Sequence, residues 1–255
     1  MSPAIPRIWF VLPTYNEKDN LRPITEAILG AVPEAHILIV DDNSPDGTGQ
    51  IADALAVERA NIAVLHRESK QGLGRAYVDG FCSVSARGAD VVVQMDSDFS
   101  HPVRYLQSML EPIRDGRADL VLGSRYVKGG AVPRWSPVRR VISLGGGVFA
   151  RIVLRLPYRD LTGGFKAWRA DLLQSVDLDA VHAGGYAFQI ETTFRARLAG
   201  ARIVEVPITF EERRVGTSKM SSGIVVEALK VVVALRWAAV RGQVPAASPS
   251  RTSSM

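Results

Sequence analysis

Two carboxylates stand two residues apart at the end of an apolar run, at Asp96 and Asp98 in the stretch VVVQMDSDFSH. The β-branched residues before them predict a buried strand that carries both acids at its carboxyl end. Side chains at positions i and i+2 of an extended chain point the same way, so one divalent cation could bind both carboxylates. Hard oxygen ligands favour Mg²⁺ or Mn²⁺, ions that commonly also hold substrate phosphates. An isolated pair of this kind also occurs in polar surface turns, so its interpretation depends on the rest of the chain.

Strands and helices alternate through the first half of the chain. Apolar runs predict strands, and amphipathic stretches predict helices between them; the strands are expected at 7–12, 36–40, 61–65, 91–95 and 119–123, and the helices at 20–29, 49–57, 72–86 and from 102 onward. This alternation predicts an α/β fold with a mostly parallel sheet flanked by helices. Ligands of such sheets bind at the carboxyl ends of the strands. Polar clusters fall at those ends, at 13–17, 41–48, 96–101 and 124–126.

Composition and motif placement exclude several classes of protein. The turn after the first strand reads PTYNE, whereas a dinucleotide-binding fold places a G-x-G-x-x-G loop there. The single cysteine, Cys82, excludes an internal disulfide. The net charge of +5 suits anionic partners such as phosphates or acidic lipid. Nucleic acid is not an expected partner, because the arginines lack interleaved aromatic residues for base stacking.

The second half of the chain carries two apolar segments with charges. Residues 139–156 predict a basic amphipathic helix, with arginines on one arc and aliphatic residues on the other, either at a membrane surface or packed on its own domain. Three consecutive glycines, 145–147, suggest a break in it. Residues 224–240 contain three charges, which makes crossing a bilayer unfavourable, so we expect a helix on the core or the membrane surface. Residues 202–210 predict an edge strand.

Six motifs occur along the chain in this order: PTYNE, VDDNSPDGT, MDSDFSH, GSRY, DLTGGFK and RVGTSK. This ordered set resembles family 2 glycosyltransferases of the GT-A fold, and the resemblance covers residues 7–220. DLTGGFK, GYAFQIE and RVGTSK make the chain most similar to the branch of polyprenol- and dolichol-phosphate mannose synthases. Related lipid-phosphate glycosyltransferases usually add two strong transmembrane helices, and this sequence has no such pair. The expected organisation is a GT-A domain at 1–220 with membrane-facing helices at about 136–156, an apolar helix at 221–242 and a disordered tail at 243–255.

The resemblance implies roles for residues at the matching positions. The implied catalytic residues are Asp96, Asp98 and Arg125. The implied nucleotide-sugar site comprises Pro13, Tyr15, Glu17, Val40, Asp42, Asp96, Ser97, Asp98, Arg125, Arg213 and Lys219. Asp96 and Asp98 would bind the Mg²⁺ or Mn²⁺ together with Ser100. Some members have a glutamine ligand at the position of Ser100, and water could substitute for that ligand here. The acceptor phosphate would meet Arg125, Arg134, Arg139 and Arg140.

The implied reaction joins GDP-mannose and a polyprenyl phosphate lipid. A lipid phosphate is already an anion at neutral pH, so it needs cations to position it and no general base, and we expect direct displacement with inversion. Such an enzyme would lie on the cytoplasmic face of a membrane, with or without a membrane-anchoring protein. The alternatives are another nucleotide sugar of the UDP-glucose type, a glycan hydroxyl acceptor with Glu191 as a base, a D-x-D aspartyl phosphatase, and a catalytically silent binding module.

Overall fold

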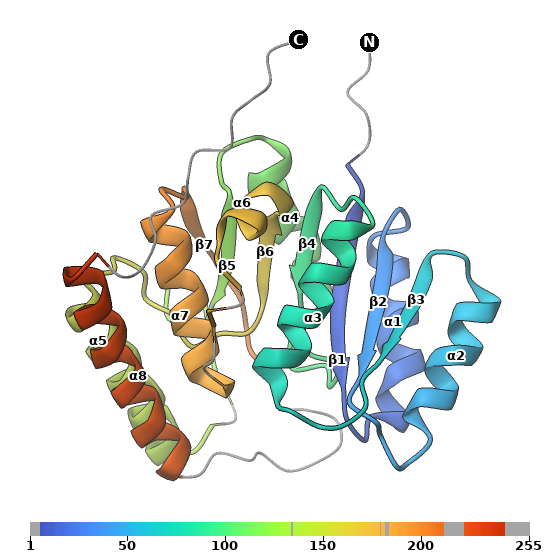
Figure 1. Ribbon diagram of the computed structural model, residues 1–255, viewed down its shortest axis with the longest axis horizontal. Coiled ribbons are helices and arrows are strands. Elements are labelled where there is room, and N and C mark those ends of the chain that lie inside the picture. Colours follow the sequence, from blue (N-terminus) through green and yellow to red (C-terminus); the bar gives the residue numbers. More distant parts are fainter. Residues whose placement is uncertain (1–5, 134, 179, 182–183, 212–221, 243–255) are drawn as a thin grey trace.

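A seven-stranded mixed sheet forms the centre of the computed structural model, which describes residues 6–133, 135–178, 180–181, 184–211 and 222–242 (Figure 1). The strand order is β3-β2-β1-β4-β6-β5-β7. All neighbouring strands run parallel except β6, which is antiparallel to both β4 and β5. The strands are β1 (Ile8–Thr14), β2 (His36–Asp41), β3 (Ile62–His66), β4 (Val91–Gln94), β5 (Leu120–Ser124), β6 (Lys166–Arg169) and β7 (Ile203–Pro207).

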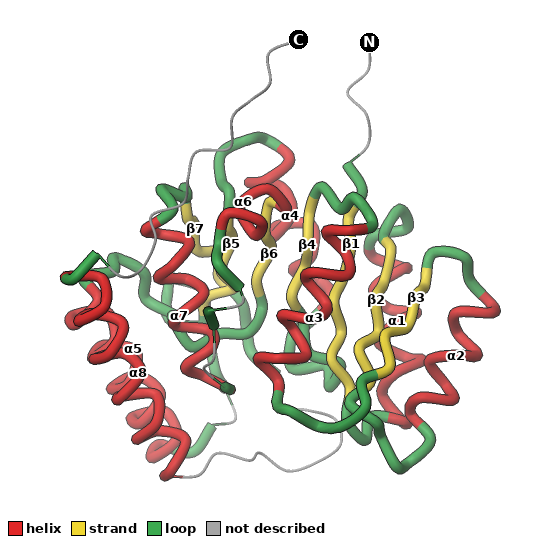
Figure 2. The backbone as a smooth tube through the Cα atoms, viewed as in Figure 1, coloured by secondary structure: helices red, strands yellow, loops and turns green. Residues whose placement is uncertain are grey.

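Helices cover both faces of this sheet (Figure 2). The described helices are α1 (Lys18–Ala31), α2 (Thr48–Glu58), α3 (Leu73–Ala86), the 3₁₀ turn η1 (Val103–Tyr105), α4 (Leu106–Arg114), α5 (Pro137–Leu154), α6 (Ala170–Ser175), α7 (Gly185–Leu198) and α8 (Ser222–Val240). Alternate residues of a strand point to opposite faces. In β1, Phe10 belongs to an apolar cluster that includes residues of α1, α2 and α4, whereas Val11 belongs to a second cluster that includes residues of α3, α6 and α7. Helices α5 and α8 pack on α7 around a third apolar cluster.

The predicted α/β architecture is confirmed, with one strand added. β6 and the short helix α6 were not predicted, because a four-residue strand, KAWR, with a charge at each end has no apolar run or alternation to mark it. The insertion of β6 between β4 and β5 makes the sheet mixed. The predicted edge strand is confirmed, since β7 lies at one end of the sheet.

The predicted break at the three glycines is wrong, because α5 is continuous from Pro137 to Leu154. Each glycine lowers helix propensity by about 1 kcal/mol relative to alanine. Burial of Ala150 and Leu154 in the cluster shared with α7 and α8 offsets that loss. The RVGTSK motif at 214–219 and the predicted tail at 243–255 lie outside the described residues.

Close packing of α3 on the sheet depends on Gly80. A Cβ added there would overlap Val11 Cγ1 and lie 3.1 Å from Val40 Cγ2. We therefore expect Gly80→Ala to lower the free energy of unfolding by about 1–3 kcal/mol, as measured by urea denaturation. Gly30 on α1 is exposed, with nothing within 4 Å of an added Cβ, so Gly30→Ala should raise the free energy of unfolding slightly. Equal values for the two variants would contradict this account of the packing.

Candidate active site

The loops that follow β1, β2 and β4 meet at the carboxyl edge of the sheet. The backbone N–H of Glu17 donates to Thr48 Oγ1 at 2.9 Å, which joins the first loop to the second. Ser97 Oγ donates to the carbonyl oxygen of Pro13 at 3.1 Å, which joins the first loop to the D-x-D loop. These bonds bring together polar clusters that are distant in sequence, as expected for a parallel sheet.

Each of these loops contains a non-glycine residue with a left-handed backbone. The φ angles are 60° at Asn16, 56° at Asn43 and 66° at Phe99. Asparagine tolerates this conformation, but a bulky residue such as phenylalanine is strained in it. Strained backbone persists where the surrounding structure holds it, and it is common at functional sites. At Phe99 it accompanies the sharp turn in which the backbone N–H of Ser100 bonds Asp98 Oδ1 at 3.0 Å.

A cavity of about 230 Å³ opens between these loops. It is called the acidic cavity here because four carboxylates, Glu17, Asp42, Asp96 and Asp98, reach it. One ammonium also lines it, that of Lys70, whose Nζ lies 3.5 Å from the ring centroid of Tyr15. The lining residues are Pro13, Thr14, Tyr15, Glu17, Asp42, Lys70, Leu73, Ala76, Asp96, Ser97 and Asp98.

Asp42 is held in this cavity by Arg67, which sequence reasoning missed. The Arg67 guanidinium pairs with Asp42 through Nη1 and donates from Nε to Asp79 Oδ2 at 2.8 Å. Burial raises the pKa of Asp42, and the bond from Arg67 opposes that rise. The position of Arg67 in the sequence could have identified it, because Arg67 directly follows β3 and so lies at the same edge of the sheet.

Asp96 of the D-x-D pair is held through both its carboxylate and its backbone N–H. Tyr77 donates its hydroxyl to Asp96 Oδ1 at 2.8 Å, and burial raises the pKa of Tyr77, so it remains a neutral donor. The N–H of Asp96 donates to His101 Nδ1 at 3.1 Å, and burial lowers the pKa of His101. His101 is therefore a neutral imidazole with its proton on Nε2.

The donors around the D-x-D pair fit a hard divalent cation. Ser100 Oγ is buried and has no hydrogen-bond partner in the described part of the chain, so it is an oxygen available to a ligand. Within the described residues no third His, Cys, Asp or Glu joins Asp96 and Asp98 in a metal-binding cluster. Mg²⁺ and Mn²⁺ sites of this composition take their remaining ligands from water and substrate phosphates.

A second cavity of about 160 Å³ adjoins the first, and the two share Leu73 and Asp96. It is called the arginine cavity here, after Arg125 and Arg139. Its lining residues are Leu73, Asp96, Ser100, His101, Arg125, Trp135, Arg139, Thr162, Gly164, Gly185, Tyr186, Gln189 and Phe210.

Arg125 is buried and largely occupied by Asp160. Its Nε donates to Asp160 Oδ2 and its Nη2 to Asp160 Oδ1, both at 2.7 Å, and Nη2 also bonds Thr162 Oγ1 at 2.8 Å. Burial favours the neutral forms, but each partner opposes this, so the pKa of Asp160 is lowered and that of Arg125 is raised. In the described structure only Nη1 of Arg125 is left without a hydrogen bond to protein.

Arg139 provides a second cation in this cavity. Its guanidinium lies 4.2 Å from the ring centroid of Trp135, and its Nε is buried without a hydrogen-bond partner among the described residues. Arg140, its neighbour on α5, is exposed and does not line the cavity.

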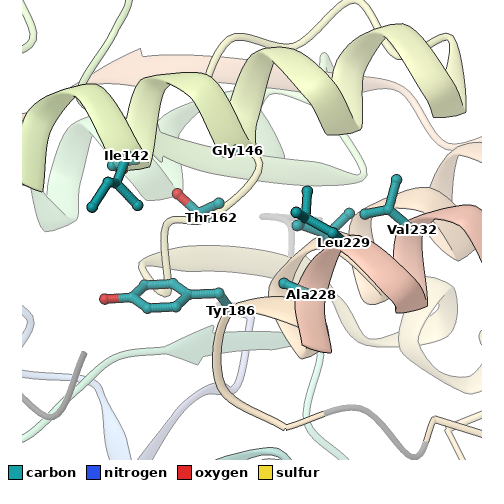
Figure 3. Close-up of a pocket in the computed structure, with 9 residues that line it drawn as sticks. Ile142, Gly146, Thr162, Tyr186, Ala228, Leu229 and Val232 are labelled. Carbon is teal, nitrogen blue, oxygen red and sulfur yellow. The ribbon is translucent and has the colours of Figure 1, made fainter. Parts of the chain in front are cut away.

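A third cavity, of about 50 Å³, lies between α5, α7 and α8 (Figure 3). It is lined mainly by apolar side chains and shares Thr162 and Tyr186 with the arginine cavity; this apolar cavity is formed by Ile142, Ser143, Gly146, Thr162, Tyr186, Ile190, Ala228, Leu229 and Val232. The three cavities are therefore contiguous, and their chemistry changes from acidic through cationic to apolar.

Most of the predicted site residues converge on the first two cavities. The structure does not bring Val40 there, because its side chain is buried in the core against α3. Arg134, Arg213 and Lys219 lie outside the described residues. Sequence reasoning missed Lys70, Asp160, Thr162, Tyr186 and Gln189, although the motifs DLTGGFK and GYAFQIE contain four of them.

The chain belongs to glycosyl transferase family 2, whose model matches residues 9–183. Two curated relatives cover most of the chain. An undecaprenyl-phosphate mannosyltransferase of Micrococcus luteus is 48% identical over 241 residues, which are 93% of this chain and 98% of that protein. A polyprenol monophosphomannose synthase of Mycolicibacterium smegmatis is 46% identical over 224 residues, 88% of this chain and 84% of that protein.

Solved structures of glycosyltransferases share the fold. Glucosyl-3-phosphoglycerate synthase from Mycobacterium tuberculosis, in complex with Mn²⁺, UDP-glucose and glycerol 3-phosphate, superposes with a TM-score of 0.67 at 19% identity, covering 92% of this chain and 81% of that one. A mannosyltransferase from Pyrobaculum calidifontis, in complex with GDP-Man and Mn²⁺, superposes with a TM-score of 0.57 at 15% identity, covering 95% of this chain and 76% of that one. The expected GT-A fold is thereby confirmed, and the protein is a glycosyltransferase.

The Arg125–Asp160 pair gives a stability prediction. Asp160→Asn leaves a buried guanidinium without its counter-charge, so we expect the free energy of unfolding to fall by about 3–5 kcal/mol in urea denaturation. Replacing both partners, in Arg125→Met/Asp160→Asn, should cost less than the single change. As a control, Glu58→Gln removes a solvent-exposed ion pair with Arg22 and should have little effect. A loss no larger than that of the control would contradict the proposed importance of the buried pair.

Proposed function

We propose that this protein transfers mannose from GDP-mannose to a polyprenyl phosphate, forming polyprenyl phosphate mannose and GDP. The observation that carries the proposal is the contiguity of the acidic, arginine and apolar cavities. The acidic cavity suits a nucleoside diphosphate sugar with a metal ion. The arginine cavity suits an anionic phosphate, and the apolar cavity suits a hydrocarbon chain. The mannosyltransferase relatives support the sugar and the lipid class, and the fold shared with a GDP-Man complex is consistent with the donor.

The donor diphosphate is assigned to the acidic cavity, with Mg²⁺ or Mn²⁺ held by Asp96, Asp98 and Ser100. A metal ion bound by these residues would supply positive charge to stabilise the leaving diphosphate. Tyr15 and Lys70 form the wall of this cavity, and Lys70 offers a cation for a phosphate. Asp42, fixed by Arg67, is placed to accept hydrogen bonds from a ribose or base.

The acceptor phosphate is assigned to the arginine cavity, near Arg139 and the free Nη1 of Arg125. These cations hold the phosphate while one of its oxygens attacks the anomeric carbon, on the side opposite the departing GDP, with inversion. A phosphate oxygen attacks as an anion and needs no proton acceptor. The isoprene carbons next to the phosphate then extend past Thr162 and Tyr186 into the apolar cavity (Figure 3).

The groups of the arginine cavity favour a phosphate acceptor over a glycan hydroxyl, which requires a general base. Glu191, the base considered from the sequence, does not line the cavity and is paired with Arg195 at 2.8 Å. His101 uses its free lone pair to accept from the backbone. Among the described residues that line this cavity, Asp96 is the only carboxylate, and it is assigned to the metal.

The enzyme reaches its lipid from a membrane surface in this proposal. No helix of the described chain is both long enough and apolar enough to span a bilayer. Instead, α5 and α8 lie together at one end of the molecule (Figure 1) and expose large apolar side chains, which form the membrane face: Val138, Val141, Ile142, Leu144, Val148, Ile152, Val233, Trp237 and Val240. Exposed Arg140 on α5, Arg155 directly after α5 and Lys230 on α8 suit the anionic headgroups of a cytoplasmic leaflet.

Transfer itself is tested with purified protein, radiolabelled GDP-mannose, polyprenyl phosphate and Mn²⁺, followed by extraction of labelled lipid into organic solvent. We expect labelled lipid from the wild type, loss of it with EDTA, and a fall of at least about 100-fold in kcat/KM for Asp98→Asn, which removes a charged metal ligand. Asp171→Asn, an exposed residue on α6, should retain activity. No labelled lipid from the wild type, or full transfer in EDTA, would refute the proposal.

The membrane face is tested by adding charge to it. Val141 and Ile152 are 68% and 71% exposed, so Val141→Glu/Ile152→Glu should leave folding intact. The added carboxylates should reduce binding to phosphatidylglycerol-containing vesicles by about 10-fold or more in co-sedimentation. Val57→Glu is the matched control, because Val57 is 89% exposed on α2, away from this face. Equal binding by all three proteins would rule the face out.

A further inference from the structure

The side chain of Gln189 lies at the wall of the arginine cavity with one end of its amide fixed. Gln189 belongs to α7 and is only 3% exposed. Its Oε1 accepts a hydrogen bond from Gln94 Nε2 at 2.7 Å, and Gln94 is completely buried on β4, two residues before Asp96. The described residues supply no hydrogen-bond acceptor for the other end of the amide, Nε2. This donor is therefore directed by the sheet and available to a ligand.

Gln189 and Gly164 both line the arginine cavity, and Gln189 Nε2 lies next to Gly164. A Cβ built on Gly164 would lie 3.5 Å from Gln189 Nε2, 3.4 Å from His101 Cε1 and 3.8 Å from Asp96 Oδ1. Three polar side chains, two from the loop after β4 and one from α7, thus surround one point, and any side chain at Gly164 would occupy it. Because Asp96 lines both cavities, this point adjoins the position assigned to the diphosphate.

The backbone at Gln189 is held as firmly as its side chain. Its carbonyl oxygen accepts from Lys166 Nζ at 2.8 Å, and the same ammonium contacts Thr192 Oγ1 at 3.1 Å and Thr193 Oγ1 at 3.0 Å. Lys166 is the β6 residue that pairs with Gln94 in the sheet. One pair of neighbouring strand residues therefore anchors both the backbone and the amide of Gln189.

Gln94 itself is not explained by stability. Its Oε1 is buried without a hydrogen-bond partner in the described part of the chain, an arrangement that costs free energy. An apolar residue would fill the same place without that loss. What Gln94 provides is orientation, because its amide donor holds Gln189 Oε1 and turns Gln189 Nε2 toward the cavity.

We propose that Gln189 donates a hydrogen bond to a hydroxyl of the donor sugar, which lies over Gly164, and so helps to determine sugar specificity. Gln94 acts as the positioning residue. The inference rests on the proposed function, since it takes the donor diphosphate to be bound at Asp96 and Asp98. From that position a hexose extends into the arginine cavity, and the directed amide meets one of its hydroxyl groups.

Monodeoxy analogues of GDP-mannose, each lacking one hydroxyl, test the inference in the lipid transfer assay. With the wild type, kcat/KM should fall by about 10- to 100-fold for the analogue that lacks the contacted hydroxyl. With Gln189→Ala, the parent donor should be slowed to a similar degree, and that same analogue should be used as well as the parent. Gln189→Met, which keeps the length of the side chain without its amide, serves if the alanine variant fails to fold.

Two further variants complete the test. Gln94→Leu should reduce the wild-type preference for the parent donor over that analogue, because the amide of Gln189 can then rotate. Gln107→Ala, an exposed glutamine on α4, should keep the wild-type preference. If the fall in kcat/KM for every deoxy analogue, relative to GDP-mannose, is the same in the wild type and the Gln189 variants, the inference is overturned while the proposed function stands. If the wild type transfers no mannose from the parent donor, the proposed function itself has failed.

Discussion

The buried ion pair between Arg125 and Asp160 is the interaction on which the site depends. Arg125 follows β5, and Asp160 belongs to the loop that leads into β6, which runs antiparallel to both of its neighbours. Asp160 accepts from both the guanidinium and the backbone N–H of Arg125, so it fixes the start of that loop against the end of the sheet. The loop then carries Thr162 and Gly164 into the cavities. Without the pair, a buried charge and an unsupported loop would remain.

This pairing also changes the part that Arg125 plays in the chemistry. The sequence suggests that Arg125 is a free cation for phosphate. In the structure, the carboxylate of Asp160 pairs with its guanidinium and neutralises most of its charge. Its remaining donor, Nη1, provides direction more than net charge. Arg139, stacked on Trp135, is then the more complete cation of the cavity.

The separation of the cavities follows from the topology of the sheet. The parallel strands β1, β2 and β4 end at one edge and carry their acidic loops there, as in other α/β proteins. The antiparallel β6 reverses the chain, so the loop preceding it enters from the same edge and contributes Thr162 to both the arginine cavity and the apolar cavity. The helices α5, α7 and α8 are packed on one another through a cluster of their own, which provides an apolar environment next to the arginine cavity.

The sequence by itself determined the α/β alternation, the D-x-D pair at a strand end, the edge strand and the family, because these depend on local periodicity and on ordered motifs. Only the tertiary structure decided which residues meet. It moved Val40 into the core and left Arg140 on the surface, since a side chain's direction depends on helix rotation and strand pairing. It also joined Asp160 to Arg125 and Gln94 to Gln189, which are 35 and 95 residues apart. The continuous helix across three glycines has the same origin, because burial on neighbouring helices outweighs local propensity.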